Sequence, residues 1–242
     1  MVFLYVFIMI TKNSTYNVAF SDFKSIPQID LREDEYYLFQ YSTDDDIDQS
    51  ILKYYLEFLP QKFKEEVLKY RRWDDRYNCL FGKLMVYMGS YLFGYNSFMF
   101  EKILKDNYGK PYMADSNFNF NISHSGNTVV CVFSKQEIGI DIEEINDIEF
   151  DLFKDVFTSG ELSDIKAQGL DTFYEYWTKK ESVIKAVGKG MSIPLTEIEI
   201  RQESTTYEND TWYTESFKMD NKYCSITSKN KLRMAQEMHV VF

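Results

Sequence analysis

The chain has few of the residues on which disulfide frameworks and zinc sites are built. Among its 242 residues there are three cysteines, which lie far apart and show no CxxC spacing: Cys79, Cys131 and Cys224. An odd and scattered set of this kind indicates neither a disulfide framework nor a zinc site. It fits a reducing compartment best, and we expect a cytoplasmic protein.

The chain also has fewer basic than acidic residues. The 27 lysines and arginines face 38 aspartates and glutamates, which gives a net charge of −11. A protein with this balance repels a polyphosphate backbone at long range unless its basic residues are clustered. Nucleic acid is therefore not an expected partner.

The longest apolar run at the start of the chain, MVFLYVFIMI at 1–10, lacks the features of a targeting segment. No basic residue precedes it, no small-residue cleavage site follows it, and it is too short to span a bilayer. We predict a buried strand here and no membrane association. An incorrectly assigned start site is the alternative that the sequence leaves open.

The sequence is rich in the residues that build a core, since 45% of it is hydrophobic and 17% is aromatic. Its length suits one large domain or two small, closely packed ones. Alternating and aromatic-rich runs predict strands, and apolar positions three and four apart predict helices. The strands are expected at 35–42, 118–123, 128–134, 138–145 and in several runs after 193, and the helices at 47–57, 60–95 and 150–187.

This order of strands, helices and strands occurs twice, and it predicts an α+β protein made of two similar halves. A Ser/Thr-x-x-Glu pattern in TSGE, at 158–161, predicts that Thr158 and Glu161 cap the start of a helix.

The stretch GIDIEE, at 139–144, places two acidic side chains on one side of a predicted strand. Side chains two apart in a strand point the same way, so Asp141 and Glu143 project together while Ile140 and Ile142 face the core. Paired carboxylates raise each other's pKa unless a cation lies between them, and hard oxygen ligands suit Mg²⁺. A solvent-facing strand edge explains this stretch equally well.

The stretch WTKKESVIKAVGKG, at 177–190, adds a second acidic position. On a helix, Trp177, Glu181 and Lys185 fall four apart and share one stripe. An ordinary surface ion pair of Glu181 with Lys185 is the simpler interpretation, but Trp177 suggests that this face is covered. Asp141, Glu143 and Glu181 could together hold one divalent ion, with Lys185 binding a phosphate oxygen, an arrangement suited to phosphoryl transfer.

Five motifs in this order and spacing resemble one enzyme family: YGKP, NISHSG, GIDIEE, FTSGEL and the stretch at 177–190. They resemble the 4′-phosphopantetheinyl transferases of the type that activates surfactin synthetase, from about residue 35 to the end. The resemblance implies a pseudo-twofold α+β arrangement of two similar α/β halves, with coenzyme A in the cleft between them. We divide the chain into an N-terminal extension (1–34), a first half (35–125) and a second half with the metal site (126–242).

The resemblance also implies a reaction. The hydroxyl of a carrier-protein serine attacks the β-phosphate of coenzyme A, the phosphopantetheine arm is transferred, and adenosine 3′,5′-bisphosphate leaves. Such a hydroxyl needs a general base, for which Glu181 is the first candidate and a metal-bound water the second. The partners implied are coenzyme A and an acyl, peptidyl or aryl carrier protein, and the protein is expected to act as a monomer.

Matching motifs assign roles to individual residues. A lone histidine in a turn is more often structural, but the resemblance makes His124 a donor to the phosphate-bearing end of coenzyme A. The predicted metal ligands, for Mg²⁺ or alternatively Mn²⁺, are Asp141, Glu143 and Glu181. The predicted catalytic residues are Glu181, Lys185 and His124, and the predicted cofactor-binding residues are Lys62, Gly109, Lys110, Pro111, Ser123, His124 and Lys185.

Three positions depart from the family pattern. Asn78 stands where an arginine is common, Cys79 where a small hydroxyl residue is common, and Glu65 where a lysine occurs. These changes alter the predicted binding site of the 3′-phosphate, and Arg71, Arg72 or Arg76 could compensate. Because carrier proteins are usually acidic, like this chain, docking should use a local patch, for which the candidates are the segments 62–72 and 156–165.

The sequence is also compatible with two other functions. Acids on a strand followed by Glu and Lys on a helix also occur in magnesium-dependent nucleases, although the negative charge argues against one. An inactive module that binds coenzyme A or docks a carrier protein would explain the departures at Asn78 and Cys79.

Overall fold

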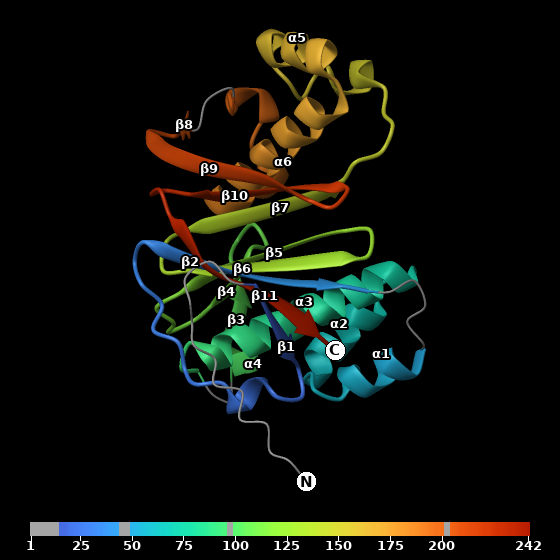
Figure 1. Cartoon of the computed structure of the whole chain (residues 1–242), viewed down its shortest axis with the longest axis vertical. Coiled ribbons are helices and arrows are strands. Elements are labelled where there is room, and N and C mark those ends of the chain that lie inside the picture. Colours follow the sequence, from blue (N-terminus) through green and yellow to red (C-terminus); the bar gives the residue numbers. More distant parts are fainter. Residues whose placement is uncertain (1–14, 44–48, 96–98, 201–203) are drawn as a thin grey trace.

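Two β-sheets stacked between helices form the centre of the molecule. The computed structural model describes residues 15–43, 49–95, 99–200 and 204–242. In Figure 1 the layers run from helix α6 through the second sheet and the first sheet to helix α3. The predicted strand at residues 1–10 lies outside the described residues.

The first sheet has five strands in the order β1-β11-β2-β6-β5. The central strand β2 runs parallel to β11 and antiparallel to β6. Its strands are β1 (Thr15–Ala19), β11 (Arg233–Val241), β2 (Glu35–Ser42), β6 (Thr128–Ser134) and β5 (Asn119–Ser125). The late strand β11 therefore lies between two early ones.

The second sheet has four antiparallel strands in the order β7-β10-β9-β8. They are β7 (Ile138–Glu144), β10 (Lys222–Ser228), β9 (Asp210–Met219) and β8 (Ser204–Tyr207). A separate two-stranded hairpin pairs β3 (Ile103–Lys105) with β4 (Pro111–Met113).

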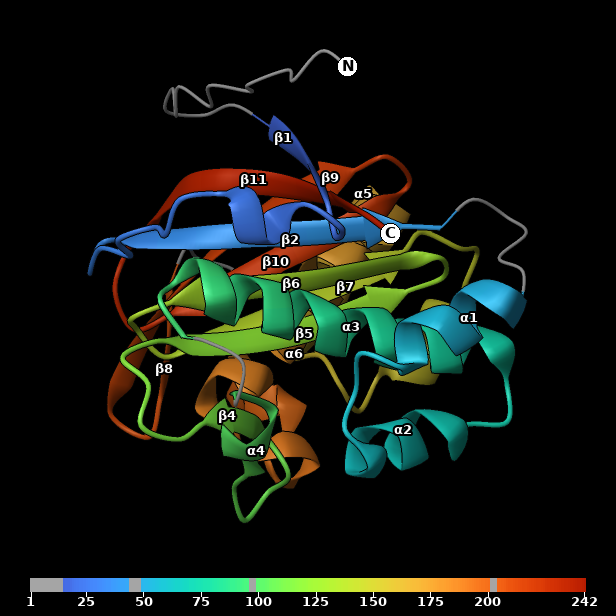
Figure 2. The ribbon, with the colours of Figure 1, turned by 90° about the horizontal axis from the view of Figure 1, so that it is seen from below.

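Each sheet is covered on its outer face by one long helix, and Figure 2 shows α3 lying along the first sheet with α1 and α2 beside it. The α-helices are α1 (Gln49–Leu56), α2 (Gln61–Leu68), α3 (Trp73–Leu92), α4 (Met99–Lys102), α5 (Ser159–Gln168) and α6 (Leu170–Val187). Short 3₁₀ turns are η1 (Phe23–Ser25), η2 (Phe150–Phe153), η3 (Gly190–Ser192) and η4 (Leu195–Glu197).

The main cores lie between these layers. One apolar cluster fills the space between α3 and the first sheet, and a second, which includes Leu38, Val132 and Ile140, fills the space between the two sheets. Phe20, Phe23 and Leu31 belong to the first cluster, so the described part of the predicted N-terminal extension is part of the core of the first half.

Close packing of α6 on the second sheet depends on small residues. Thr178 and Ser182 of α6 form hydroxyl–hydroxyl hydrogen bonds of 2.7 Å with Ser225 and Thr227 of β10. A Cβ built on Gly139 of β7 would overlap the Ser182 carbonyl oxygen and the Ala186 nitrogen, so only glycine allows the helix backbone to lie this close.

Most of the predicted elements are found where the sequence placed them. The strand predicted for the run IPLTEIEIRQ, from Ile193, is wrong over its described residues, because Pro194 caps the start of the 3₁₀ turn η4 and no strand is formed up to residue 200. The helix predicted at 60–95 is divided into α2 and α3. The mixed α/β architecture and the pairing of β5 with β6 are confirmed, and so is the capping box of Thr158 and Glu161 at the start of α5. The pseudo-twofold relation, the cleft between the halves and the domain boundary near residue 125 stay predictions. The strands β6 and β11, which follow that boundary in the chain, lie in the first sheet.

Candidate functional site

The acids of GIDIEE lie on β7 as the alternation predicts. Ile140 and Ile142 are fully buried between the sheets, and Asp141 is itself 3% exposed. The Asp141 Oδ2 atom is buried and has no hydrogen-bond partner among the described residues. A buried carboxylate oxygen without a donor is costly, so this atom marks a place where a cation or donor would be favourable.

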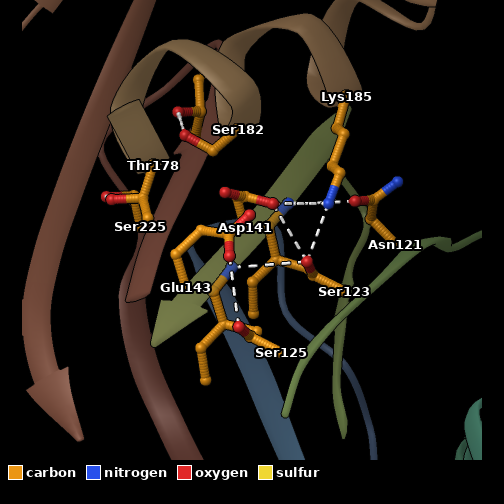
Figure 3. Close-up of polar contacts among 12 residues, drawn as sticks. Asn121, Ser123, Ser125, Asp141, Glu143, Thr178, Ser182, Lys185 and Ser225 are labelled. Carbon is orange, nitrogen blue, oxygen red and sulfur yellow. Dashed lines mark hydrogen bonds and ion pairs between the residues drawn. The ribbon is translucent and has the colours of Figure 1, made fainter. Parts of the chain in front are cut away.

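The other carboxylate oxygen of Asp141 is held by two donors (Figure 3). The Lys185 ammonium, which α6 carries over β7, lies 2.6 Å from Asp141 Oδ1 and donates to Ser123 Oγ at 2.8 Å. The Ser123 hydroxyl donates to the same Oδ1 atom at 3.0 Å. The structure therefore brings together three of the predicted site residues from β5, β7 and α6.

Glu143 extends this group along β7. It accepts a hydrogen bond of 3.1 Å from the Ser125 hydroxyl. Burial, and then repulsion from Asp141, raise the pKa of Glu143 to about 7. Hydrogen bonds from Ser125 and Trp177 and the charge of Lys185 act in the opposite direction and lower this pKa. The contact with Trp177 fits the stripe predicted for α6.

Glu181 faces the same cluster from α6. Its pKa is raised by burial and then by repulsion from Asp141, while the Lys185 ammonium lowers it. Three carboxylates thus share one partly desolvated region. In the contacts described above, Lys185 is the ammonium group that partners them. Negative charge in such a place is stabilised by a bound cation.

The donor set fits a divalent cation in its chemistry. Carboxylate oxygens are the ligands that Mg²⁺ prefers, and the unpartnered Oδ2 of Asp141 is available to one. In the described part of the chain, however, no three His, Cys, Asp or Glu side chains converge as a ready metal site. The assignment of Asp141, Glu143 and Glu181 as ligands stays a prediction.

The polar side chains of β5 hold the acids in place, and sequence reasoning missed this role. Asn121, Ser123 and Ser125 accept hydrogen bonds from the backbone N–H groups of Ile140, Ile142 and Glu144. These bonds join edge strands of the two sheets. The signal was present as a period of two in NISHS, where polar side chains alternate with Ile122 and His124.

His124 points away from the acids, toward α3. There the Asn78 amide nitrogen lies 3.4 Å from His124 Nδ1 and donates to the Gly126 carbonyl at 3.3 Å. The pKa of His124 is lowered by partial desolvation and then by Lys185, while Asp75 and Asp141 act in the opposite direction. The departure noted at Asn78 is therefore a direct neighbour of the predicted phosphate donor.

The loop of Gly109, Lys110 and Pro111 lies against the end of α6. The Lys110 ammonium donates to the Ala186 carbonyl at 2.8 Å, and burial lowers the pKa of Lys110 to about 8. Gly109 adopts a φ of 88°, which favours glycine. The loop is thus tied to the helix that carries Lys185.

The remaining predicted residues lie on α2 and the start of α3. Lys62 is exposed, and its ammonium lies 5.7 Å from the centre of the Phe63 ring. Arg76 stacks on Trp73 at 4.9 Å and donates to the Tyr70 carbonyl. Cys79 is half-buried, and burial raises the pKa of its thiol. None of these contacts tests a role in cofactor binding.

A hollow of the molecule lies apart from this site. It measures about 480 Å³ and lies between β2, β11, β9 and β10, and the predicted site residues do not line it. No helix of the described residues has the length and apolar character needed to cross a bilayer.

Fold and site together define a mixed α/β protein with an acidic, lysine-containing site shared by a strand and a helix. Comparison with known families identifies its class. Residues 137–235 match the model of the 4′-phosphopantetheinyl transferase superfamily, and residues 47–136 match that of the 4′-phosphopantetheinyl transferase N-terminal region. The predicted acids and Lys185 all lie in the first of these matches.

Individual relatives agree. The chain is 36% identical over 166 residues to the 4′-phosphopantetheinyl transferase gsp of Aneurinibacillus migulanus, covering 66% of this chain and 69% of that protein. It is 34% identical over 155 residues to the 4′-phosphopantetheinyl transferase Sfp of Bacillus subtilis (strain 168), covering 61% and 68%. A similar protein from Xenopus laevis, an L-aminoadipate-semialdehyde dehydrogenase-phosphopantetheinyl transferase, is 30% identical over 149 residues, covering 48% and 49%.

The chain belongs to the 4′-phosphopantetheinyl transferase superfamily, and it is an enzyme of that class. The resemblance seen in the five sequence motifs is confirmed.

Proposed function

We propose that the protein transfers the 4′-phosphopantetheine arm of coenzyme A to a serine of an acyl, peptidyl or aryl carrier protein. The reaction depends on Mg²⁺, for which Mn²⁺ can substitute, and releases adenosine 3′,5′-bisphosphate. The names of the relatives support the transferase activity. The dependence on a metal ion is proposed from the acidic site, and the identity of the product from the resemblance to the family.

One observation carries this proposal for the site. Asp141 is buried, one of its oxygens is held by Lys185 and Ser123, and the other has no hydrogen-bond partner among the residues that the structure describes. Burial and repulsion from Asp141 raise the pKa values of Glu143 and Glu181 beside it. A group with this excess of buried negative charge is suited to a divalent cation bound to a diphosphate.

In this proposal Asp141, Glu143 and Glu181 hold the ion. When bound, the ion would neutralise and orient the diphosphate of coenzyme A. Lys185, which now contacts Asp141, would donate to a phosphate oxygen and stabilise the charge that develops on the leaving bisphosphate. Ser123 fixes the positions of Asp141 and Lys185 relative to each other through its hydrogen bonds with both.

The chemical step forms a bond between the carrier serine oxygen and the β-phosphorus. The bond from that phosphorus to the oxygen bridging to the α-phosphate breaks, and its electron pair leaves with adenosine 3′,5′-bisphosphate. The serine proton passes to Glu181. Glu181 is the first candidate for the base that takes this proton because it faces the cluster from α6, and a metal-bound water is the second candidate.

The nucleotide end of coenzyme A is assigned to the residues that match the family motifs. Gly109, Lys110 and Pro111 lie along the nucleotide, Ser123 and His124 contact the phosphate-bearing end, and Lys62 approaches the adenosine phosphates. We place the cofactor in a cleft between the two halves. The hydrogen bond from Lys110 to the Ala186 carbonyl supports a nucleotide loop that is fixed relative to Lys185.

A substitution of Asp141 tests the site. In Asp141→Asn one charge is lost while the size of the side chain is kept, and transfer in Mg²⁺ should fall to background. The measurement is mass spectrometry of a carrier protein incubated with coenzyme A, in which transfer adds one phosphopantetheinyl group. Circular dichroism should show an unchanged fold.

The matched control is Glu144→Gln, because Glu144 follows Glu143 at the end of β7 and accepts a hydrogen bond from Asn221 at 3.1 Å instead. This variant should keep full activity. Full transfer by Asp141→Asn would remove the metal role, and failure of the wild type to modify any carrier protein would remove the proposed function.

We further propose that the enzyme acts as a monomer in the cytoplasm, without nucleic acid or membrane partners. The net charge of −11 supports the absence of nucleic acid and membrane partners, because it repels nucleic acid and anionic lipid surfaces alike. Incubation with DNA and Mg²⁺ should give no cleavage, which distinguishes the enzyme from a nuclease with similar acids.

A further inference from the structure

Asn78 has an unusual place for a polar side chain. It lies on α3, is 5% exposed and faces the turn that follows β5. Its amide nitrogen makes two contacts there, one with the Gly126 carbonyl at 3.3 Å and one with His124 Nδ1 at 3.4 Å. A single NH₂ group carries two hydrogens, so it can serve both partners as a donor.

The carbonyl of Gly126 fixes the orientation of this amide. A carbonyl oxygen can only accept, so the amide nitrogen of Asn78, and not its oxygen, must face Gly126. The same nitrogen then faces His124 Nδ1 as a donor. It follows that Nδ1 must carry no proton, because two donors facing each other form no bond.

We propose that Asn78 is a positioning residue that fixes His124 as the neutral tautomer protonated on Nε2, so that the phosphate-bearing end of coenzyme A meets an uncharged N–H donor. The inference rests on the proposed function for the role of His124 toward coenzyme A. The tautomer itself does not depend on it. Because Asn78 stands where an arginine is common, this chain replaces a cation with a residue that acts through the histidine.

The charges around His124 agree with a neutral ring. Partial desolvation, and then the charge of Lys185 on α6, lower the pKa of His124, while Asp75 of α3 and Asp141 of β7 act against them. A proton on Nδ1 would also break the bond with Asn78. A neutral ring on a surface-facing side chain leaves its Nε2–H free to donate to an anion.

Nitrogen-15 NMR of the free enzyme tests the tautomer directly. The chain has only two histidines, His124 and His239, so the variant His239→Gln assigns the signals. Near neutral pH, His124 should show a proton on Nε2 and none on Nδ1. A proton on Nδ1 in the wild type would overturn the inference.

Substitution of Asn78 supplies the second test. Asn78→Leu should give a mixture of His124 tautomers and lower kcat/KM for coenzyme A about fivefold, or about 1 kcal/mol, as expected for one hydrogen bond. With 3′-dephospho-coenzyme A the same substitution should have little effect, since the donor serves the missing phosphate. A merely structural defect would lower kcat/KM equally for coenzyme A and for 3′-dephospho-coenzyme A.

Asn119→Leu is the matched control. Asn119 lies on the same strand as His124, and its amide donates to the Lys135 carbonyl at 3.1 Å instead of to a histidine. This variant should leave the His124 tautomer unchanged. A wild-type tautomer that persists in Asn78→Leu contradicts the inference, whereas a wild type that shows the tautomer but transfers nothing contradicts only the proposed function.

Discussion

Lys185 interacts with every acidic residue of the site. It contacts Asp141 and Ser123, and its charge lowers the pKa values of Glu143 and Glu181. Its role could be structural, as the partner of a buried acid, or catalytic, as a donor to phosphate. Both roles follow from the same geometry. Kinetics separates them, because the proposed catalytic role acts on the transition state.

We expect Lys185→Ala to lower kcat/KM at least about tenfold, which corresponds to about 1.4 kcal/mol of lost transition-state stabilisation. Steady-state kinetics with coenzyme A and a carrier protein measures the effect. Lys179→Ala is the control, because Lys179 lies on the same helix and pairs with Glu175 at i and i+4. If both variants keep wild-type kinetics, Lys185 is only an ion-pair partner.

The pKa of Glu143, raised to about 7, predicts how pH acts on the metal-free protein. Between its ordinary value and pH 7, the folded state binds a proton that the unfolded state lacks. Stability should therefore fall as pH rises through this window. Because a metal ion binds the ionised carboxylate, added Mg²⁺ should raise the melting temperature more at about pH 8 than at about pH 6.

Thermal unfolding with Mg²⁺ or with a chelator, at both pH values, measures this difference. In Glu143→Gln the dependence of the metal effect on pH should be largely lost. An equal effect of Mg²⁺ at both pH values in the wild type would show that Glu143 does not bind the ion.

At the scale of elements, the contact of α6 with β7 decides where Glu181 and Lys185 lie relative to Asp141. Gly139 permits this contact, because any Cβ there would overlap the backbone of α6. We expect Gly139→Ala to destabilise the fold by about 1–3 kcal/mol and to lower transfer further than stability alone explains, since the helix must move away from the acids.

Gly89→Ala provides the comparison. A Cβ on Gly89 of α3 would overlap the Phe133 ring in the core between α3 and the first sheet, away from the acids. This variant should lose stability by a similar mechanism and keep its kcat among folded molecules. Denaturant unfolding and kinetics at low temperature measure both quantities, and an equal loss of kcat in the two variants would argue against the positioning role of Gly139.

The elements differ in how far the sequence predicted them. The aromatic and aliphatic mix of its residues placed β2, and alternation placed β7 and the side of β7 on which Asp141 lies, because both patterns are local. The hydrogen bonds from β5 side chains to the β7 backbone could not be predicted, since they join the edges of two different sheets. The link of Asn78 to His124 likewise depends on how α3 packs against the turn at Gly126.

At the scale of the molecule, an acidic enzyme must bind a partner expected to be acidic. The segment from α2 to the start of α3 combines basic residues with exposed apolar ones, since Arg71 and Arg72 lie beside Leu68, Tyr70 and Trp73, which are all exposed. This combination supports a docking role, because basic groups attract the partner and apolar groups supply contact area.

We expect charge reversal of Arg71 and Arg72 to glutamate to raise the Michaelis constant for carrier protein at least about threefold, because rim charges act mainly on association. The value for coenzyme A should not change. Reversal of Lys218 and Lys229, which lie on or next to strands of the second sheet, changes the net charge equally and serves as control. Equal effects of both pairs would exclude this docking surface.

The position of β11 between β1 and β2 has a consequence for biosynthesis. All strands of the second sheet precede β11 in the chain, so the first sheet stays divided while they leave the ribosome. The nascent first half therefore exposes two strand edges that only the last strand can join. Until β11 is made, this gap leaves the growing chain open to mispairing with other strands.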